Sequence, residues 1–242
     1  NVIYDYKKIG LWNTTDPDYK YLQTLQPGGN AGMIKVLYTG GYNTDGTPKR
    51  QIGPDDRQIL NCDPDFQGGF NTRVAYKNFD LSMVGSFVSG GILNSTLYGG
   101  SGYLNNMNTR AGNNVKVDYW TPENTGAKYP KPGGLQSGDN PYYASTLGYF
   151  SASYLKVRTI TLGYNFNQKW LQYAGISKMR VYATVENPFV LFSPYHNESG
   201  MDPEPNSYGD QNVAVAGSHS KLIVGTNTPS THNYVIGLNV TF

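Results

Sequence analysis

The chain has 242 residues, of which 15% are charged and 38% are hydrophobic, and its formal net charge is +2. This small net charge, without a cluster of Lys and Arg, argues against a nucleic-acid-binding protein. The sequence contains no apolar run of about 18 residues, so it predicts no transmembrane helix. Its single cysteine, Cys62, excludes an internal disulfide. The 29 glycines and 21 tyrosines favour many strands joined by tight turns.

The N-terminal half predicts a short strand and then a β-hairpin. Residues 2–6 begin in the middle of a strand pattern, which indicates a fragment of a longer chain. Residues 70–76 and 79–87 both alternate apolar with small or polar side chains, and Lys77 and Asn78 form the turn between them.

The C-terminal half predicts three more strands. Residues 153–166 change the parity of their apolar positions halfway, which indicates a β-bulge. Residues 167–177 form a short connection with one helical turn that ends at Gly175. A strand follows from residue 178 toward 192. In the last strand, residues 234–242, one face is wholly apolar and the other is small and polar.

The connections alternate between long and short. Residues 10–69, 90–148 and 193–229 are long and polar, whereas 77–78 and 167–177 are short. Outer-membrane β-barrels have this asymmetry, with short periplasmic turns and long external loops. The pattern therefore predicts an all-β chain with about five full barrel strands and a partial one at residues 2–6. So few strands do not close a barrel, so the rest comes from other chains or from a larger polypeptide. A soluble all-β carbohydrate-binding module and a passive porin or adhesin barrel stay open as alternatives.

Several motifs resemble SusC/RagA-like TonB-dependent outer-membrane transporters. These are residues 63–81 around the hairpin, 154–164 in the bulged strand, Trp170 and Leu171 in the turn, 186–189 and 200–204 around the last loop, and the terminal 237–242. The resemblance covers residues from about 10 to 242, in the order of the family.

The resemblance implies that residues 1–242 are the C-terminal portion of an antiparallel transmembrane barrel of about 22 strands, with the plug domain outside this chain. It implies import of oligosaccharides or peptides across the outer membrane of a Gram-negative, Bacteroidetes-like cell. The expected partners are a SusD-like lipoprotein, the TonB complex, the barrel assembly machinery, the ligand and outer-membrane lipid. No nucleic acid and no cofactor are expected.

Aromatic residues are the candidate site residues. Aromatic faces stack on sugars and also anchor protein interfaces. Loop packing is the simpler explanation for any single residue among them. Candidate contacts with substrate or partner are Trp120, Tyr119, Tyr142, Tyr143 and Tyr195. Candidates for a membrane girdle and an assembly signal are Tyr164, Phe166, Trp170, Tyr234 and Phe242.

The sequence favours neither a metal site nor an enzyme. The acidic segment around Asn43 and Asp45 lacks two of the four ligand positions of a calcium loop, so a plain turn is expected. The three histidines are dispersed and no nucleophile motif occurs. Asp202 and Glu204 flank a proline, and we interpret them as solvated turn residues.

Overall fold

The computed structural model describes residues 2–95, 97–98, 118–131, 142–204, 223–224 and 231–242. The chain forms two compact units. One comprises residues 63–91, 151–204 and 227–242, and the other comprises residues 1–62, 92–150 and 205–226. Each unit therefore combines segments that are far apart in the sequence. Within the described segments, no helix is both long enough and apolar enough to cross a membrane.

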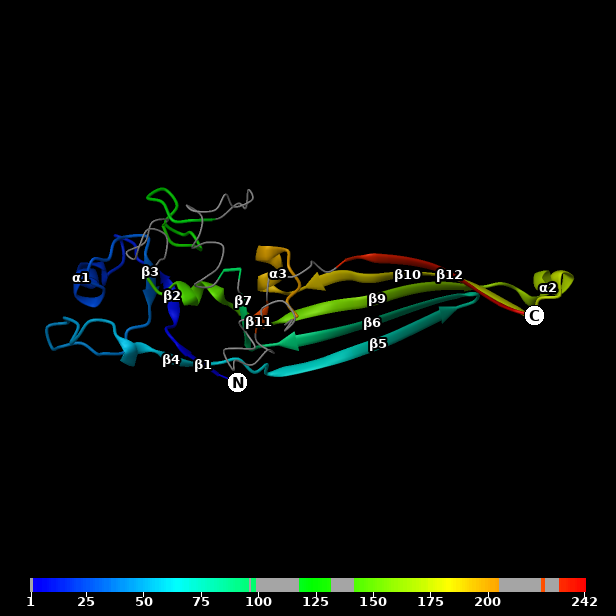
Figure 1. The fold of residues 1–242 in the computed structure, drawn as a ribbon, viewed down its shortest axis with the longest axis horizontal. Coiled ribbons are helices and arrows are strands. Elements are labelled where there is room, and N and C mark those ends of the chain that lie inside the picture. Colours follow the sequence, from blue (N-terminus) through cyan, green and yellow to red (C-terminus); the bar gives the residue numbers. More distant parts are fainter. Residues whose placement is uncertain (1, 96, 99–117, 132–141, 205–222, 225–230) are drawn as a thin grey trace. The chain divides into compact units, whose positions relative to one another are not determined.

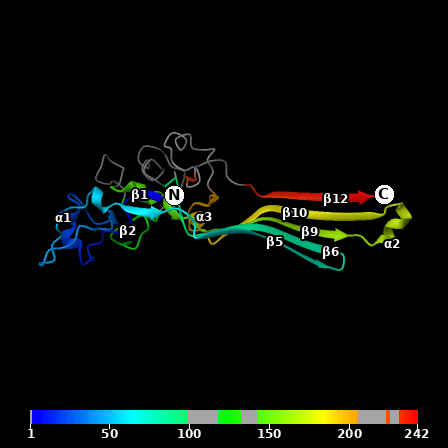
Figure 2. The ribbon, with the colours of Figure 1, turned by 90° about the horizontal axis from the view of Figure 1, so that it is seen from below.

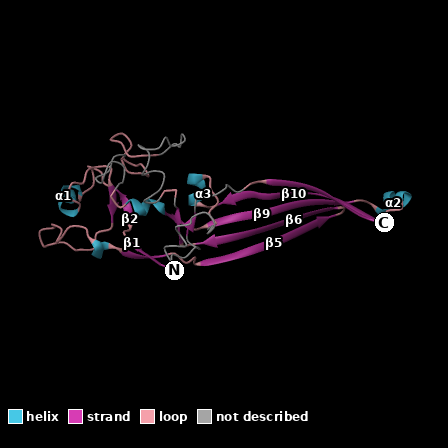
Figure 3. Ribbon diagram, viewed as in Figure 1, coloured by secondary structure: helices cyan, strands magenta, loops and turns pink. Residues whose placement is uncertain are grey.

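The first unit is a five-stranded antiparallel sheet. Its strands are β5 (Phe66–Tyr76), β6 (Phe79–Ser89), β9 (Tyr154–Asn165), β10 (Lys178–Leu191) and β12 (Asn233–Thr241). They lie in the order β12-β10-β9-β6-β5, as Figure 1 shows, and Figure 3 shows β10, β9, β6 and β5 side by side. The five strands predicted from alternation are thereby confirmed, and all of them pair within one sheet.

The short connections lie together at one end of the sheet. Lys77, with φ at +52°, makes the tight turn between β5 and β6. Between β9 and β10 run α2 (Gln168–Leu171) and the 3-10 turn η5 (Gln172–Ala174), which ends at Gly175 with φ at +68°. A left-handed residue is a common helix stop and glycine adopts it at little cost. The predicted helical turn is confirmed.

The C-terminus is tied to the same end of the sheet. The Ser177 amide and hydroxyl both donate to the carbonyl oxygen of Thr241, at 2.8 and 2.9 Å. Figure 2 shows the end of β12 beside the connection that carries α2. The long connections consequently leave from the opposite end, as the lengths of the loops predict.

A bulge interrupts the middle of the sheet. The registers of β9 against both β6 and β10 shift around Arg158, which has no partner residue on either neighbour. On β10 the shift spans Asn187, whose φ is +52°. Such an extra residue re-aims the side chains that follow it. The parity change predicted within residues 153–166 is confirmed.

The second unit contains short strands in three small sheets. β1 (Val2–Asp5) pairs with β4 (Gln58–Asn61), and β2 (Lys8–Leu11) pairs with β3 (Ile34–Val36). A third sheet has the order β11-β7-β8, formed by Ile223–Val224, Ile92–Ser95 and Tyr149–Ser151. The unit also holds short helical turns, which are η1 (Tyr19–Tyr21), α1 (Leu22–Leu25), η2 (Pro54–Asp56) and η4 (Ala144–Gly148).

Residues 2–6 differ from the prediction. They do not join the large sheet as a partial barrel strand, because β1 pairs with β4 instead. The stretches predicted as long polar loops also contain a folded core, centred on Trp12, Leu22, Leu25 and Ile34, which are almost fully buried. The short strands of these stretches do not show enough alternation to be recognised in the sequence.

Asp56 holds part of this second unit together. Its fully buried carboxylate accepts hydrogen bonds from the amides of Thr39 and Gly53, at 2.7 and 2.9 Å, and from both terminal nitrogens of Arg50. Burial alone raises the pKa of Asp56, but the bonds from Arg50, Gly53 and Thr39 outweigh it and hold the pKa at about 2.

We predict that this part of the unit loses stability in acid. The folded pKa lies below the ordinary 3.8 of an unfolded Asp, so the stabilisation is complete above about pH 4 and is lost as the pH falls toward 2. Hydrogen exchange at the Thr39 and Gly53 amides, corrected for intrinsic rates, should show easier opening at pH 3 than at pH 5. Asp56→Asn should remove this difference. An equal pH dependence in both proteins would contradict the prediction.

Candidate functional site

The register of the five-stranded sheet separates apolar from polar side chains. One row across the sheet pairs apolar residues from strand to strand, and these are Val74, Leu81, Leu162, Ala183 and Ile236. The adjacent row is polar or small, and it contains Asp80, Gly163, Tyr182 and Gly237. Since side chains alternate along a strand, these rows belong to opposite faces of the sheet.

The apolar face is exposed. Ile236 retains 84% of its accessible surface and Leu162, on the central strand, retains 50%. A soluble domain normally covers a continuous apolar surface of this kind with a second layer. Within the described residues this layer is missing, and the face is available to an apolar surrounding.

Aromatic residues gather at both ends of the apolar face. At the short-turn end, the Tyr164 ring lies 4.8 Å from Phe79 and 5.1 Å from Phe166, measured between ring centroids. At the opposite end, Phe66 lies 6.0 Å from Phe87. Among the predicted girdle residues, Trp170 and Phe242 belong to the short-turn end, whereas Tyr234 is the second residue of β12, at the other end. All three are largely exposed.

The polar face carries an ion pair near the short-turn end. Asp80 is 3% exposed, and Arg180 binds both of its oxygens, with Nη2 at 2.7 Å and Nε at 3.2 Å. Asn165 donates to the same carboxylate at 3.2 Å, and Arg73 lies 3.8 Å away. A bidentate Arg–carboxylate pair fixes geometry as well as charge. This arrangement crosses strands β5, β6, β9 and β10.

Two glycines give this face its shape. A Cβ atom at Gly163 would overlap the Arg180 guanidinium, and one at Gly237 would overlap the Tyr182 ring. Each glycine therefore lets a large neighbouring side chain lie flat on the backbone of the sheet. The Arg180 guanidinium also lies 5.2 Å from the Tyr182 ring centroid, a cation–π distance.

A second charged cluster lies on β9 at the long-loop end. Lys156 is 4% exposed, and its ammonium contacts Asp202 and, at 2.7 Å, Glu204. Arg158 contacts Glu204 as well, and the Tyr154 hydroxyl donates to it at 3.1 Å. Burial alone raises the pKa of the Glu204 carboxyl, but Lys156 and Arg158 hold it below its usual range.

This cluster corrects the interpretation of Asp202 and Glu204 as solvated turn residues. They follow α3 (Pro194–Ser199), which has Ser193 as its N-cap and Gly200, with φ at +70°, as its C-cap. The cluster thus ties the segment that follows β10 to strand β9. The sequence signal for this cluster is limited to its spacing. Lys156 and Arg158 are two residues apart on β9, and Asp202 and Glu204 are two residues apart in the loop.

The predicted contact aromatics fall into two groups. Trp120 and Tyr195 are 6% and 0% exposed, and the Trp120 indole N–H donates to Asn13 at 2.7 Å. Packing accounts for these two residues. Tyr119 and Tyr142 are exposed, and the Tyr142 and Tyr143 rings meet edge to face at 4.7 Å. Tyr195 belongs to the first unit, whereas the other four residues belong to the second.

The acidic residues near position 43 are engaged within their own turn. Asp45 accepts from the amide and hydroxyl of Thr47, at 2.9 and 2.6 Å. In the described segments, no group of three or more His, Cys, Asp or Glu side chains is arranged to hold a metal ion.

Related sequences are TonB-dependent receptors. The chain is 31% identical over 195 residues to TonB-dependent receptor P3 of Formosa agariphila, which covers 79% of this chain and 18% of that protein. It is 35% identical over 147 residues to TonB-dependent receptor SusC of Bacteroides thetaiotaomicron, which covers 60% of this chain and 13% of SusC. No family model matches the chain. The chain spans about a fifth or less of the length of these relatives.

The fold is similar to that of solved structures of the same kind. A structure of the RagAB peptide transporter matches all of this chain and 23% of its own, with a TM-score of 0.61 and 17% sequence identity. The closed-closed state of the RagAB peptide importer gives a TM-score of 0.60. In sequence and fold, this chain is therefore a SusC/RagA-like segment of the TonB-dependent receptor family.

Proposed function

We propose that residues 1–242 are the C-terminal portion of the β-barrel of an outer-membrane importer. The complete barrel has about 22 strands, and its plug and TonB-contacting segment lie in other parts of the protein. The complete protein takes up oligosaccharides or peptides in a TonB-dependent manner. The observation that carries the proposal is the exposed apolar face of the five-stranded sheet, with an ion-paired polar face behind it.

The dimensions of the apolar face support a membrane position. Phe66 and Tyr76 mark the two aromatic ends of β5, roughly 34 Å apart along the strand. A strand tilted by about 45° then spans about 24 Å. This height matches the apolar band of about 25 Å in outer-membrane barrels, which aromatic girdles flank on both sides.

The edges of the sheet also support it. β5 and β12 are the outer strands, and each has only one partner among the described strands. Unpaired backbone groups are not tolerated in lipid, so each edge needs a further strand. In the proposed barrel, β12 pairs with the first strand and closes the wall. The barrel assembly machinery inserts it, and the terminal Phe242 is part of the assembly signal.

In this proposal the polar face lines the lumen and the long connections face the outside. A SusD-like lipoprotein delivers the solute to these connections, and the TonB complex drives its passage. The SusC relative and the RagAB importer support this pairing. Tyr119 and Tyr142 are the exposed aromatics that we retain as candidate contacts with solute or partner.

Uptake with and without TonB tests the proposal. Cells with the full-length receptor, and matched cells without it, are given a defined mixture of oligosaccharides and peptides. Mass spectrometry then measures the depletion of each compound from the medium. We expect receptor-dependent depletion that ceases when the TonB gene is deleted. Depletion that continues without TonB would indicate a passive porin. A receptor that is recovered without detergent, outside the membrane fraction, would indicate a soluble binding module.

A further inference from the structure

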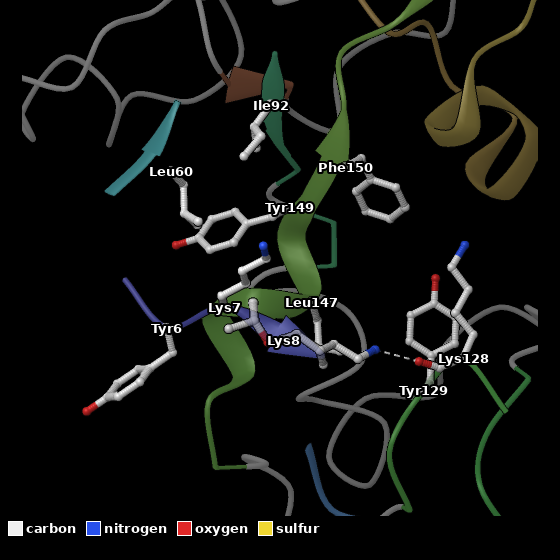
Figure 4. A pocket seen from close by; sticks show the side chains of 11 residues that line it. Tyr6, Lys7, Lys8, Leu60, Ile92, Lys128, Tyr129, Leu147, Tyr149 and Phe150 are labelled. Carbon is white, nitrogen blue, oxygen red and sulfur yellow. Dashed lines mark hydrogen bonds between the residues drawn. The ribbon is translucent and has the colours of Figure 1, made fainter. Parts of the chain in front are cut away.

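The second unit contains a pocket that the barrel wall does not explain. Its volume is about 300 Å³, and β2, β7, η4, β8 and the segment around Lys128 line it. Figure 4 shows lysine and aromatic side chains around this space. The lysines are Lys7, Lys8 and Lys128, and the aromatic residues include Tyr129, Tyr149 and Phe150.

Lys8 has no ion-pair partner among the residues that the structure describes. Lys8 is half-buried, and its ammonium donates one hydrogen bond, at 2.7 Å, to the carbonyl oxygen of Lys128. Neither Lys7 nor Lys8 makes an ion pair within the part of the chain that the structure describes. A partly buried cation without a counter-ion is unfavourable, so an anion that enters the pocket gains a strong partner.

Asp5 carries the carboxylate that is nearest in sequence to Lys7 and Lys8, and it is hydrogen-bonded to Tyr149. The Tyr149 hydroxyl donates to Asp5 at 2.6 Å. Burial, the largest cause, raises the pKa of Tyr149, so the phenol remains a neutral donor at neutral pH. Asp5 therefore orients one wall of the pocket.

The aromatic walls indicate what the anion is attached to. Tyr129 and Phe150 are buried, and Tyr98 packs against both, with ring centroids 5.8 and 5.2 Å away. Rigid aromatic faces with a few polar groups suit a compact ring or an apolar side chain. The volume accommodates one such unit, whereas a long chain extends beyond it.

We propose that this pocket binds the carboxylate of a solute, with Lys8 as its principal partner and the aromatic side chains against the adjoining ring or apolar group. A uronic acid residue of an acidic oligosaccharide and the C-terminus of a peptide both supply this chemistry. The assignment of the bound molecule as an imported solute rests on the proposed function. Binding to the pocket and uptake by the receptor are measured separately.

The site also has an expected pH dependence. Burial, followed by the charge of Lys128, lowers the pKa of Lys8 to about 8. The other titratable groups at the pocket are Lys7, Lys128, Tyr6, Tyr129 and Tyr149, with Asp5 behind Tyr149. Since Lys8 must be protonated to attract an anion, the affinity should be full at pH 7 and should fall as the pH rises above about 8.

Calorimetry on the full-length receptor in detergent tests the proposal. The probes are digalacturonate against neutral galactobiose, and a short peptide with a free C-terminus against its C-terminal amide. Variants are Lys8→Met, which keeps the apolar stem, Lys8→Arg, which keeps the charge, and Lys49→Met. Lys49 is an exposed lysine of the same unit away from the pocket, so its variant has the same change in net charge.

We expect at least one acidic probe to bind more tightly than its neutral analogue. Lys8→Met should weaken that binding about tenfold or more, whereas Lys8→Arg and Lys49→Met should change it less than about threefold. The probe that binds distinguishes uronate from peptide carboxylate. Equal binding of acidic and neutral probes, or equal effects of Lys8→Met and Lys49→Met, would overturn the proposal. Binding that depends on Lys8, without uptake that depends on TonB, would support the proposed site and contradict the proposed import function.

Discussion

Replacement of Leu238 by lysine is expected to lower the amount of folded receptor in the outer membrane about tenfold or more. Leu238 lies on the apolar face of β12, pairs with Val181 and is largely exposed. In the proposed barrel this face meets lipid, where a lysine costs about 2–4 kcal/mol at the bilayer midplane. Because folded proteins are only marginally stable, a cost of this size lowers the fraction of the receptor that folds.

The same strand offers a matched control for this prediction. Val235 lies on the opposite face of β12, where it pairs with Thr184. Val235→Lys adds the same charge to the same strand but directs it to the polar face. Immunoblots of outer membranes, with heat-dependent gel mobility as the sign of a folded barrel, should show a near-normal level of this variant. Similar levels of the two variants would contradict the assignment of the faces.

Replacement of Lys156 by methionine is expected to release the segment after β10 from the sheet. The change leaves the carboxylates of Asp202 and Glu204 without their buried partner. Removal of one member of a buried ion pair costs about 3–5 kcal/mol. Because the cluster ties this segment to β9, we expect the cost to appear as local opening of residues 194–204 while the strands stay paired.

Hydrogen exchange on the full-length receptor measures this opening. Amides of α3 and of Glu204 should exchange faster in Lys156→Met, whereas amides of β9 and β10 should not change. Arg158→Met is the control, since Arg158 is more exposed and its pair with Glu204 contributes about 0–1 kcal/mol. The triple variant with Asp202→Asn and Glu204→Gln should recover part of the protection. Unchanged exchange in Lys156→Met would show that other contacts hold the segment.

The sequence was sufficient to predict the five long strands, because each alternates over many residues and neighbours in the sheet are mostly successive strands. The hairpin at Lys77, the bulge near Arg158 and the stop at Gly175 each have a local chemical signal. These features depend on turn residues and on parity, which are read directly along the chain.

The second unit and the charged clusters were not predictable in this way. β7 pairs with β11, and β1 pairs with β4, across long separations and through only a few residues each. Lys156 and Asp202 likewise meet only after α3 has turned the chain back. The burial of Trp120 and Tyr195 was not predictable either, because the sequence does not show whether an aromatic residue in a polar stretch packs or remains exposed.

The glycines opposite Arg180 and Tyr182 control how far these side chains stand out from the wall. With Gly163 and Gly237 in place, the guanidinium and the phenol ring lie against the backbone of the sheet, and the polar face stays shallow there. Any larger residue at either position forces its neighbour upright and narrows the free cross-section beside it. In the proposed barrel, two residues without a side chain would therefore set the clearance for a solute along this part of the lumen.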